Sequence, residues 1–309
     1  MKQLIHQFID QLKQQKYSAN SLSNHQRDLK RFEKWLGGSD TKEITLFDLQ
    51  VLKKTNIEEY LTEMSETMKP RTIARHISTL KLFFDFLESQ GHIEHAPTYL
   101  IEFPDYQMEL PELLSFQEVE ALLESPPQSH YLGLRDRSML ELAYSSGLKV
   151  NELLNLNVED LFLDLEFVKI RGKRHRMVPI TRKAIEMLHE YLAQARENRL
   201  LNKEDPCLFP GRNGTRMSRM GYWAMITKHA RRIGITRPIN ARVIRHSFAA
   251  HLIQNGMDLD HVMTLMGYVD MDAMLRYAHI NRPDYFEVYL KAHPRGRSRN
   301  DQNDPESVE

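Results

Sequence analysis

The 309 residues are 41% apolar and 27% charged, which is typical of a globular protein long enough to form two domains with separate cores. No apolar run reaches the roughly 18 residues of a membrane-spanning helix, and the single cysteine, Cys207, excludes an internal disulfide, so we expect a cytoplasmic protein without a membrane partner. The 42 basic residues equal the 42 acidic ones, which argues mildly against a nucleic-acid partner, although DNA binding needs only a local basic surface.

Residues 1–103 are predicted to form an all-helical domain. Apolar residues recur at helical spacing in LIHQFIDQL and in SLSNHQRDLKRFEKWL. A longer helix is predicted in KPRTIARHISTLKLFFDFLESQG, where Pro70 stands near the start and Gly91 after the end. Four basic residues lie largely off the apolar stripe of this last segment: Lys69, Arg71, Arg75 and Lys81. They would contact DNA phosphates if the domain binds DNA, and would otherwise form a solvated helix face.

The segment PDYQMELPE, residues 104–112, has two prolines and no apolar periodicity, and we interpret it as a linker. In the second domain, 113–293, LFLDLEFVKI and MVPIT are predicted to form two short strands joined by the basic turn RGKRHR. The predicted helices of this domain are 115–125, 134–147, 181–198, 218–234, 241–256 and 259–268. A polar tail, 294–309, follows. The expected fold class is therefore mostly α with a small β-sheet.

The common signatures of nucleotide-binding and metalloprotease sites are absent from the sequence, and we predict neither a cofactor nor a metal ion. What remains is a set of cationic residues around Tyr277. Attack on a phosphodiester needs a nucleophile, donors to the non-bridging oxygens and an acid for the leaving hydroxyl. Arg242 and Arg245 lie three apart on one helix and can face one phosphate. Further cations follow the SSG turn (Lys149) or lie in the basic turn (Arg171, Lys173 and Arg174). The alternative is that Tyr277 is an ordinary half-buried aromatic.

Several motifs in order along nearly the whole chain resemble those of the tyrosine recombinases of the Xer and phage-integrase type. SSGLKVNELLNL resembles the family's first catalytic segment, and the strand pair around RGKRHRMVPI resembles its lysine hairpin. ARVIRHSFAAHL and LMGY resemble its H-x-x-R and L-G-H motifs, and MDAMLRYAHI resembles its nucleophile segment. SANSLSNHQRDLKRFEKWL and KPRTIARHISTLKLFFDFL resemble the helices of its core-binding domain.

This resemblance implies a SAM-like N-terminal domain and a catalytic-type C-terminal domain that together clamp double-stranded DNA in a C shape. It implies site-specific DNA recombination and integration without ATP or metal. The tyrosine would attack the scissile phosphate, giving a 3′-phosphotyrosine and a free 5′-hydroxyl, and a partner strand would reverse the step. The resemblance further implies a tetramer on two DNA sites, formed by copies of this chain or with a partner recombinase.

Three residues match the family's active-site pattern: Tyr277, Arg245 and the supporting carboxylate Glu152. At four positions this chain has a different residue from the family. Lys149 stands in place of the first arginine and Arg171 in place of the hairpin lysine. Arg242 replaces the histidine of H-x-x-R, and Tyr268 replaces the histidine of L-G-H. Lysine lacks the paired donors of arginine, and arginine is a poor proton donor to a leaving oxygen. Lys173 could replace that donor if the turn is rearranged. We therefore expect phosphate binding to persist and cleavage to be weakened.

Three functions remain open at this point. The first is a recombinase with a divergent active site, which predicts a covalent DNA adduct through Tyr277. The second is a non-cleaving DNA-binding regulator, such as the repressor of a phage or mobile element, whose binding would be insensitive to Tyr277→Phe. The third is a protein-interaction module with no DNA role. Salt would separate it from the other two, because phosphate contacts make affinity fall steeply with ionic strength.

Overall fold

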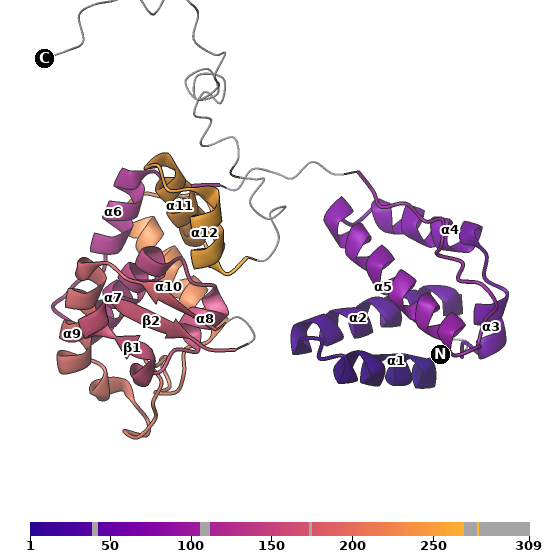
Figure 1. The fold of residues 1–309 in the computed structure, drawn as a ribbon, viewed down its shortest axis with the longest axis horizontal. Coiled ribbons are helices and arrows are strands. Elements are labelled where there is room, and N and C mark those ends of the chain that lie inside the picture. The colour runs from indigo at the N-terminus through magenta and orange to yellow at the C-terminus, as the bar shows by residue number, and fades with distance from the viewer. Residues whose placement is uncertain (39–42, 106–111, 173–174, 269–276, 278–309) are drawn as a thin grey trace, which may run out of the picture. The chain divides into compact units, whose positions relative to one another are not determined.

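The computed structural model describes residues 1–38, 43–105, 112–172, 175–268 and 277. By their contacts the residues divide into two compact units, Met1–Met108 and Glu109–Glu309. Figure 1 shows the helical N-terminal unit in indigo and purple, and the C-terminal unit, which holds the small sheet, in magenta to orange. Within the described ranges, no helix combines the length and the apolar composition that crossing a membrane requires. The structure confirms the expected fold class.

The described part of the N-terminal unit is helical and packs around one apolar core. Its helices are α1 (Lys2–Gln14), α2 (Ala19–Gly37), α3 (Leu46–Gln50), α4 (Lys54–Ser65) and α5 (Pro70–Ser89) (Figure 1). Helix α5 contacts α1, α2 and α4, and it buries an apolar stripe that includes Phe83 and Phe84. Pro70 is the first residue of α5, where its missing N–H costs no hydrogen bond and its fixed φ suits the helix.

A buried polar network joins α2 to α5. The Asp28 carboxylate accepts hydrogen bonds from Arg75 and from the Thr79 hydroxyl (3.0 Å), and His76 Nε2 lies 3.1 Å from its other oxygen. Burial lowers the pKa of His76 to about 4, although the adjacent Asp28 carboxylate opposes the shift. His76 is therefore neutral at pH 7, so its Nε2–H can donate to Asp28 while its Nδ1 accepts from the Tyr60 hydroxyl at 3.2 Å. The network satisfies the buried polar groups and fixes the two helices against each other.

The C-terminal unit is built around α7 (Tyr131–Ser146), which contacts α6, α9, α11 and β3. The other helices are α6 (Phe116–Glu124), α8 (Val150–Leu154), α9 (Arg182–Gln194), α10 (Arg219–Arg232), α11 (Ala241–Gln254) and α12 (Leu259–Met266) (Figure 1). Most residues of α7 are buried, including the charged pair Arg135 and Asp136, whose side chains are joined at 2.6 Å. Helix α7 thus fills the middle of this unit and places the turn after Ser146 beside α11.

The sheet is antiparallel, in the order β1 (Leu161–Phe162), β2 (Phe167–Ile170) and β3 (Arg176–Pro179). The sequence predicts one continuous strand where the structure has β1 and β2. The chain reverses between them through a 3₁₀ turn at Leu163–Leu165, which is followed by Glu166. Glu166 has a left-handed φ of 61°. Non-glycine residues seldom adopt that conformation, which is why periodicity alone did not predict the turn. The β2–β3 pairing is confirmed, and it brings Arg176 opposite Ile170.

Candidate active site

The C-terminal end of α12 is where the site residues meet. Gly267 ends the helix with a left-handed φ of 63°. Just before it, the Leu265 carbonyl accepts a hydrogen bond from Arg176 Nε (2.9 Å), and the Met266 carbonyl accepts one from Arg245 Nη2 (2.5 Å). A helix C-terminus carries a partial negative charge that stabilises nearby cations. The end of α12 therefore holds two arginines that come from β3 and α11.

Arg245 is fixed on a second side by the turn that follows α7. The side chain belongs to α11, is buried, and donates from Nη1 to the Gly147 carbonyl at 2.5 Å. Gly147 has a left-handed φ of 57°, and a Cβ atom placed there would come within 2.2 Å of Phe248. Only glycine permits this close approach between the turn and α11. The guanidinium is thus held between two main-chain carbonyl groups.

Glu152 connects Lys149 with Arg176. Lys149 is the N-cap residue of α8, and its backbone N–H donates to Glu152 Oε2 at 2.9 Å. The same carboxylate accepts paired hydrogen bonds from Arg176 Nη1 (2.9 Å) and Nη2 (3.0 Å). Burial by itself would raise the pKa of Glu152, but the bonds from Arg176 and the Lys149 backbone outweigh it and lower the pKa. Glu152 is therefore ionised at neutral pH and orients the Arg176 guanidinium.

Tyr268 contacts two cations with its ring. The Arg245 Cζ lies 5.1 Å and the Lys149 Nζ 5.9 Å from the ring centroid. Cations within about 6 Å of an aromatic face are attracted by its quadrupole. The ring therefore joins Lys149 to Arg245, and we refer to Lys149, Arg176 and Arg245 as the cation cluster. Cationic donors gathered at one point are suited to binding the oxygens of a phosphate.

Tyr277 lies in an apolar cluster on α11 and α12, and its hydroxyl contacts a histidine. The side chain is 0% exposed and packs with Phe248, Ala249, Ile253, Val262 and Met266. Its hydroxyl forms a hydrogen bond with Nδ1 of His246, which is also buried, and the two ring centroids are 5.7 Å apart. Met266 thus belongs to the same apolar cluster as the tyrosine, while its carbonyl binds Arg245. The nucleophile candidate and the cation cluster share the end of α12.

Arg171, at the hairpin position, is bound by two carboxylates. Its Nε donates to Asp160 (2.5 Å) and its Nη2 donates to Glu159 (2.6 Å). These hydrogen bonds raise the pKa of the guanidinium above its already high ordinary value. Arg171 is therefore a permanent cation with two anionic partners and cannot release a proton near pH 7. Lys173 and Arg174 lie outside the described residues.

Arg242 is exposed in the first turn of α11. Asn240 caps the helix by accepting hydrogen bonds from the Arg242 and Val243 N–H groups at 2.8 and 3.2 Å. In the part of the chain that the structure describes, the Arg242 side chain has neither a hydrogen bond nor an ion pair. A cation beside a helix N-terminus suits an anion, because the helix end adds N–H donors and positive potential.

The four basic residues predicted on α5 differ in their surroundings. Lys69 and Arg71 are exposed at the start of the helix. Arg75 binds Asp28 within the buried network, and the Lys81 ammonium lies 5.0 Å from the Phe103 ring centroid. Lys69 and Arg71 are therefore placed to meet solvent-borne anions, whereas Arg75 and Lys81 make contacts inside their own unit.

Two residues of the site were not among the sequence candidates. Arg176 falls within the predicted basic turn, although it begins β3, and no sequence pattern assigns a role to His246. The register between β2 and β3 would have identified Arg176, because Arg176 pairs with Ile170 and its side chain then reaches Glu152 of α8 and Leu265 of α12. His246 stands directly after Arg245, but its contact with Tyr277 joins residues 31 positions apart. Sequence periodicity does not report contacts of that kind.

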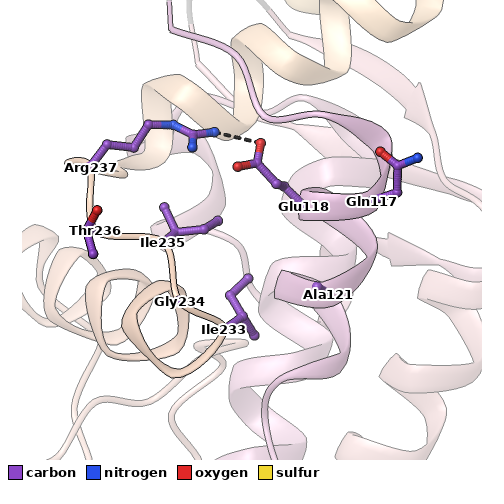
Figure 2. A pocket seen from close by; sticks show the side chains of 8 residues that line it. All are labelled: Gln117, Glu118, Ala121, Ile233, Gly234, Ile235, Thr236 and Arg237. Carbon is purple, nitrogen blue, oxygen red and sulfur yellow. Dashed lines mark hydrogen bonds and ion pairs between the residues drawn. The ribbon is translucent and has the colours of Figure 1, made fainter.

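A separate hollow lies between α6 and the segment that leads from α10 to α11. Figure 2 shows Glu118 on the helix pointing toward Arg237 on the other wall, and the lining also includes Gln117 and Ala121 of the helix and Ile233 and Ile235 of the segment. The Arg237 Nη2 donates to Glu118 at 2.6 Å, and this bond lowers the pKa of Glu118. The hollow has a volume of about 430 Å³ and includes no residue of the cation cluster. It does not form part of the candidate site.

Comparison with known sequences gives matches to both units. Residues 112–283 match the phage integrase family, and residues 5–91 match the phage integrase N-terminal SAM-like domain. The chain is 36% identical over 300 residues to the tyrosine recombinase XerD of Listeria innocua, which covers 96% of this chain and 100% of that one. It is 35% identical over 297 residues to XerD of Pseudomonas aeruginosa, covering 95% and 98% of the two chains.

Solved structures with a similar fold include recombinases bound to DNA. The Tn1549 transposon integrase in complex with circular intermediate DNA aligns with a TM-score of 0.72 at 16% identity, covering 93% of this chain and 98% of that one. The XerH site-specific recombinase bound to its palindromic difH substrate, in a post-cleavage complex, aligns with a TM-score of 0.71 at 22% identity, covering 86% and 78%. At these identities the likeness establishes the fold.

Proposed function

The chain belongs to the phage integrase family of tyrosine recombinases, and we propose that it binds duplex DNA at specific sites and exchanges strands through Tyr277 with slow intrinsic cleavage. Site-specific recombination follows from its XerD-like membership. We further assign the residues that act in strand exchange and expect the rate of cleavage to be low. One observation carries the expected slow cleavage: Arg171, at the position of the family's hairpin lysine, is bound by Asp160 and Glu159.

Phosphate binding is assigned to the cation cluster and Arg242. Arg245 and Arg176 are oriented by main-chain carbonyls at the end of α12, and Lys149 lies near the Tyr268 ring. Preoriented cationic donors stabilise charge that develops on the phosphate oxygens during attack. Lys149 offers a compact charge where arginine would offer two parallel donors, so it aligns the phosphate less sharply. In the N-terminal unit, Lys69 and Arg71 are assigned to phosphate contacts along the DNA backbone.

Proton transfer to the leaving 5′-oxygen is the step that this site supports poorly. A good donor has a pKa near the working pH, and the ion-paired Arg171 guanidinium does not meet that condition. Arg242 and Tyr268 stand where the resemblance places two histidines, so the site lacks at both positions the imidazole that suits proton transfer near neutral pH. Lys173 of the hairpin turn, or a group from a partner recombinase, would have to supply the proton. The proposal therefore includes either a tetramer of this chain or a mixed assembly on two DNA sites.

The proposed domain limits are 1–103 for the core-binding domain, 104–112 for the linker, 113–293 for the catalytic-type domain and 294–309 for the tail. We place the protein in the cytoplasm, where its DNA substrate would lie. The second candidate function is a DNA-binding regulator that does not cleave. The full burial of Tyr277 favours it, because a nucleophile with no exposed surface must move before it can reach a phosphate.

A capture experiment tests the proposal. The full chain is incubated with fragmented genomic DNA from its source, and the DNA retained in mild buffer and after SDS is sequenced separately. We expect specific fragments in both fractions, with the SDS-resistant fraction abolished by Tyr277→Phe. Specific fragments only in mild buffer would contradict cleavage and support the regulator. Loss of all binding on a modest rise in salt, without sequence preference, would contradict site-specific binding.

A further inference from the structure

His246 and Tyr277 form a buried pair in which each side chain limits the other. His246 is 4% exposed and Tyr277 is 0% exposed. Nδ1 of the histidine and the phenolic oxygen are within hydrogen-bond distance, and the two rings are tilted by 47°. Tyr277 belongs to a cluster of buried apolar residues that also contains Phe248, Ala249, Ile253, Val262 and Met266. A buried hydroxyl needs a hydrogen-bond partner, and the contact with His246 provides one.

The position of His246 on α11 connects this pair with the phosphate-binding side chains. Arg242 and His246 are four residues apart and therefore lie on one face of the helix. Arg242 occupies the place where the resemblance puts a histidine, so this chain has an imidazole one helical turn further on. Arg245, immediately before His246, binds the Met266 carbonyl, and Met266 is a member of the apolar cluster that contains Tyr277. One helix thus determines the positions of the arginines and of the tyrosine hydroxyl.

We propose that His246 is the positioning residue of the nucleophile. Its Nδ1 accepts the hydrogen bond of the Tyr277 hydroxyl and fixes the direction in which the phenolic oxygen points. The acceptor role requires the neutral ring with its proton on Nε2, because a protonated imidazole has no acceptor. The use of this position in strand exchange rests on the proposed function, whereas the hydrogen bond itself does not. The inference concerns geometry and includes no proton transfer.

Two substitutions separate the hydrogen bond from the size and polarity of the side chain. His246→Asn places an amide oxygen at the position of Nδ1 and preserves an acceptor for the hydroxyl. His246→Gln places its amide at the position of Nε2, one bond too far to replace Nδ1. Both variants are neutral and polar, so each is the control for the other. Tyr277→Phe removes only the hydroxyl and identifies the signals that belong to the pair.

The first measurement does not depend on activity. The full chain is labelled with ¹³C at the phenolic carbon of its 12 tyrosines, and the Tyr277 resonance is assigned by its absence in Tyr277→Phe. We expect this resonance to move in His246→Gln and to stay in place in His246→Asn. In wild-type protein labelled with ¹⁵N at the histidine rings, one pair of ring signals should shift on Tyr277→Phe. Unchanged signals in both experiments would overturn the inference. The ¹⁵N comparison needs no His246 variant, so unchanged ring signals there would overturn it even where the His246 variants fail to fold.

The second measurement follows covalent adduct formation on a DNA fragment recovered by capture, carrying a nick that traps the cleaved product. A misplaced nucleophile can slow a reaction up to about 100-fold, and we expect a loss of that order in His246→Gln. His246→Asn should react at a rate close to wild type, and DNA affinity should be equal in all three proteins. Equal losses in both variants would overturn the positioning role. If wild-type protein binds the DNA and forms no adduct, the proposed cleavage fails, and the resonance measurement still decides on His246.

Discussion

Two regions of the C-terminal unit bind arginine side chains, and they do so with opposite kinds of partner. At the end of α12, the two arginines of the cation cluster bind main-chain carbonyls, and Arg176 also binds one carboxylate, Glu152. At the end of β2, one cation, Arg171, is set against two carboxylates. We therefore expect the first region to offer positive charge to a phosphate, whereas in the second region two carboxylates offset the charge of Arg171. A basic residue in the sequence therefore does not by itself show whether its charge is free to bind a phosphate or is already paired with carboxylates.

Removing Arg245 should have the largest effect on the cation cluster. Arg245→Met would leave the Gly147 and Met266 carbonyls without their charged donor, and we expect a loss of about 3 kcal/mol in the free energy of unfolding. Adduct formation should fall by a factor of about 10² to 10³, because one preoriented donor at the phosphate is lost. Denaturant unfolding and the trapped-adduct assay would measure the two effects.

Arg242→Met is the matched control on the same helix. Arg242 is exposed, so we expect its stability to change by less than about 0.5 kcal/mol. DNA binding should weaken across all sequences, with the slope of log affinity against log salt reduced by about 1. Equal destabilisation by the two substitutions would show that the two carbonyl anchors contribute little.

The Glu152–Arg176 pair gives the cluster a pH dependence. The pKa of Glu152 is lowered by folding, so its stabilising contribution is present above the unfolded pKa of about 4.3 and is lost as pH falls through the lower folded value. Glu152→Gln should cost about 1.5–3 kcal/mol of unfolding free energy at pH 7. The difference between wild type and variant should shrink below about pH 4. A constant difference across pH 3–7 would mean that the charge of Glu152 contributes nothing.

Weakening the ion pairs at residue 171 would test the second region, in which carboxylates bind the cation. Arg171→Lys combined with Glu159→Gln supplies an ammonium group with one carboxylate partner, Asp160, in place of two. We expect adduct formation to rise about 10-fold, below the range of a well-placed general acid, because Asp160 still binds the cation. Glu159→Gln alone, which keeps arginine at 171, should leave the rate unchanged. An equal rise in both proteins would assign the gain to lost negative charge.

The smallest expected effect concerns Tyr268. Tyr268→Phe keeps the ring near Lys149 and Arg245, whereas Tyr268→Leu removes it. Cation–π contacts at partly exposed sites contribute about 0.5–1 kcal/mol, so Leu should be less stable than Phe by about that amount. Denaturant unfolding of both variants would measure the difference. The opposite order would show that the hydroxyl, and not the ring, matters at this position.

The sequence predicted the parts of the fold that depend on local patterns. Helix α5 begins at Pro70 as expected, and α7 ends before the left-handed Gly147 as expected. The break between β1 and β2 escaped prediction because a glutamate, Glu166, adopts the left-handed conformation there.

Within the candidate site, local sequence indicated charge but not its partners. The ordered motifs identified the family and the altered positions, yet the ion pairs of Arg171 cross 11 and 12 positions of the chain, and the Arg176–Leu265 contact crosses 89. The Arg171 pairs depend on the packing of β2 beside the 3₁₀ turn at Val158–Asp160, and the Arg176–Leu265 contact joins β3 to α12. The site residues themselves stay predictions that the variants above can test.

The anchoring of Arg245 has a consequence for how such a site can change over generations. Its two acceptors are the main-chain oxygens of Gly147 and Met266, and no replacement of a side chain deletes a backbone carbonyl. The neighbouring positions, whose roles depend on side-chain chemistry, can drift one at a time while this guanidinium keeps its place. A recombinase site that loses its acid and its histidines would then still bind phosphate, and selection could keep the DNA-binding protein after the chemistry has faded.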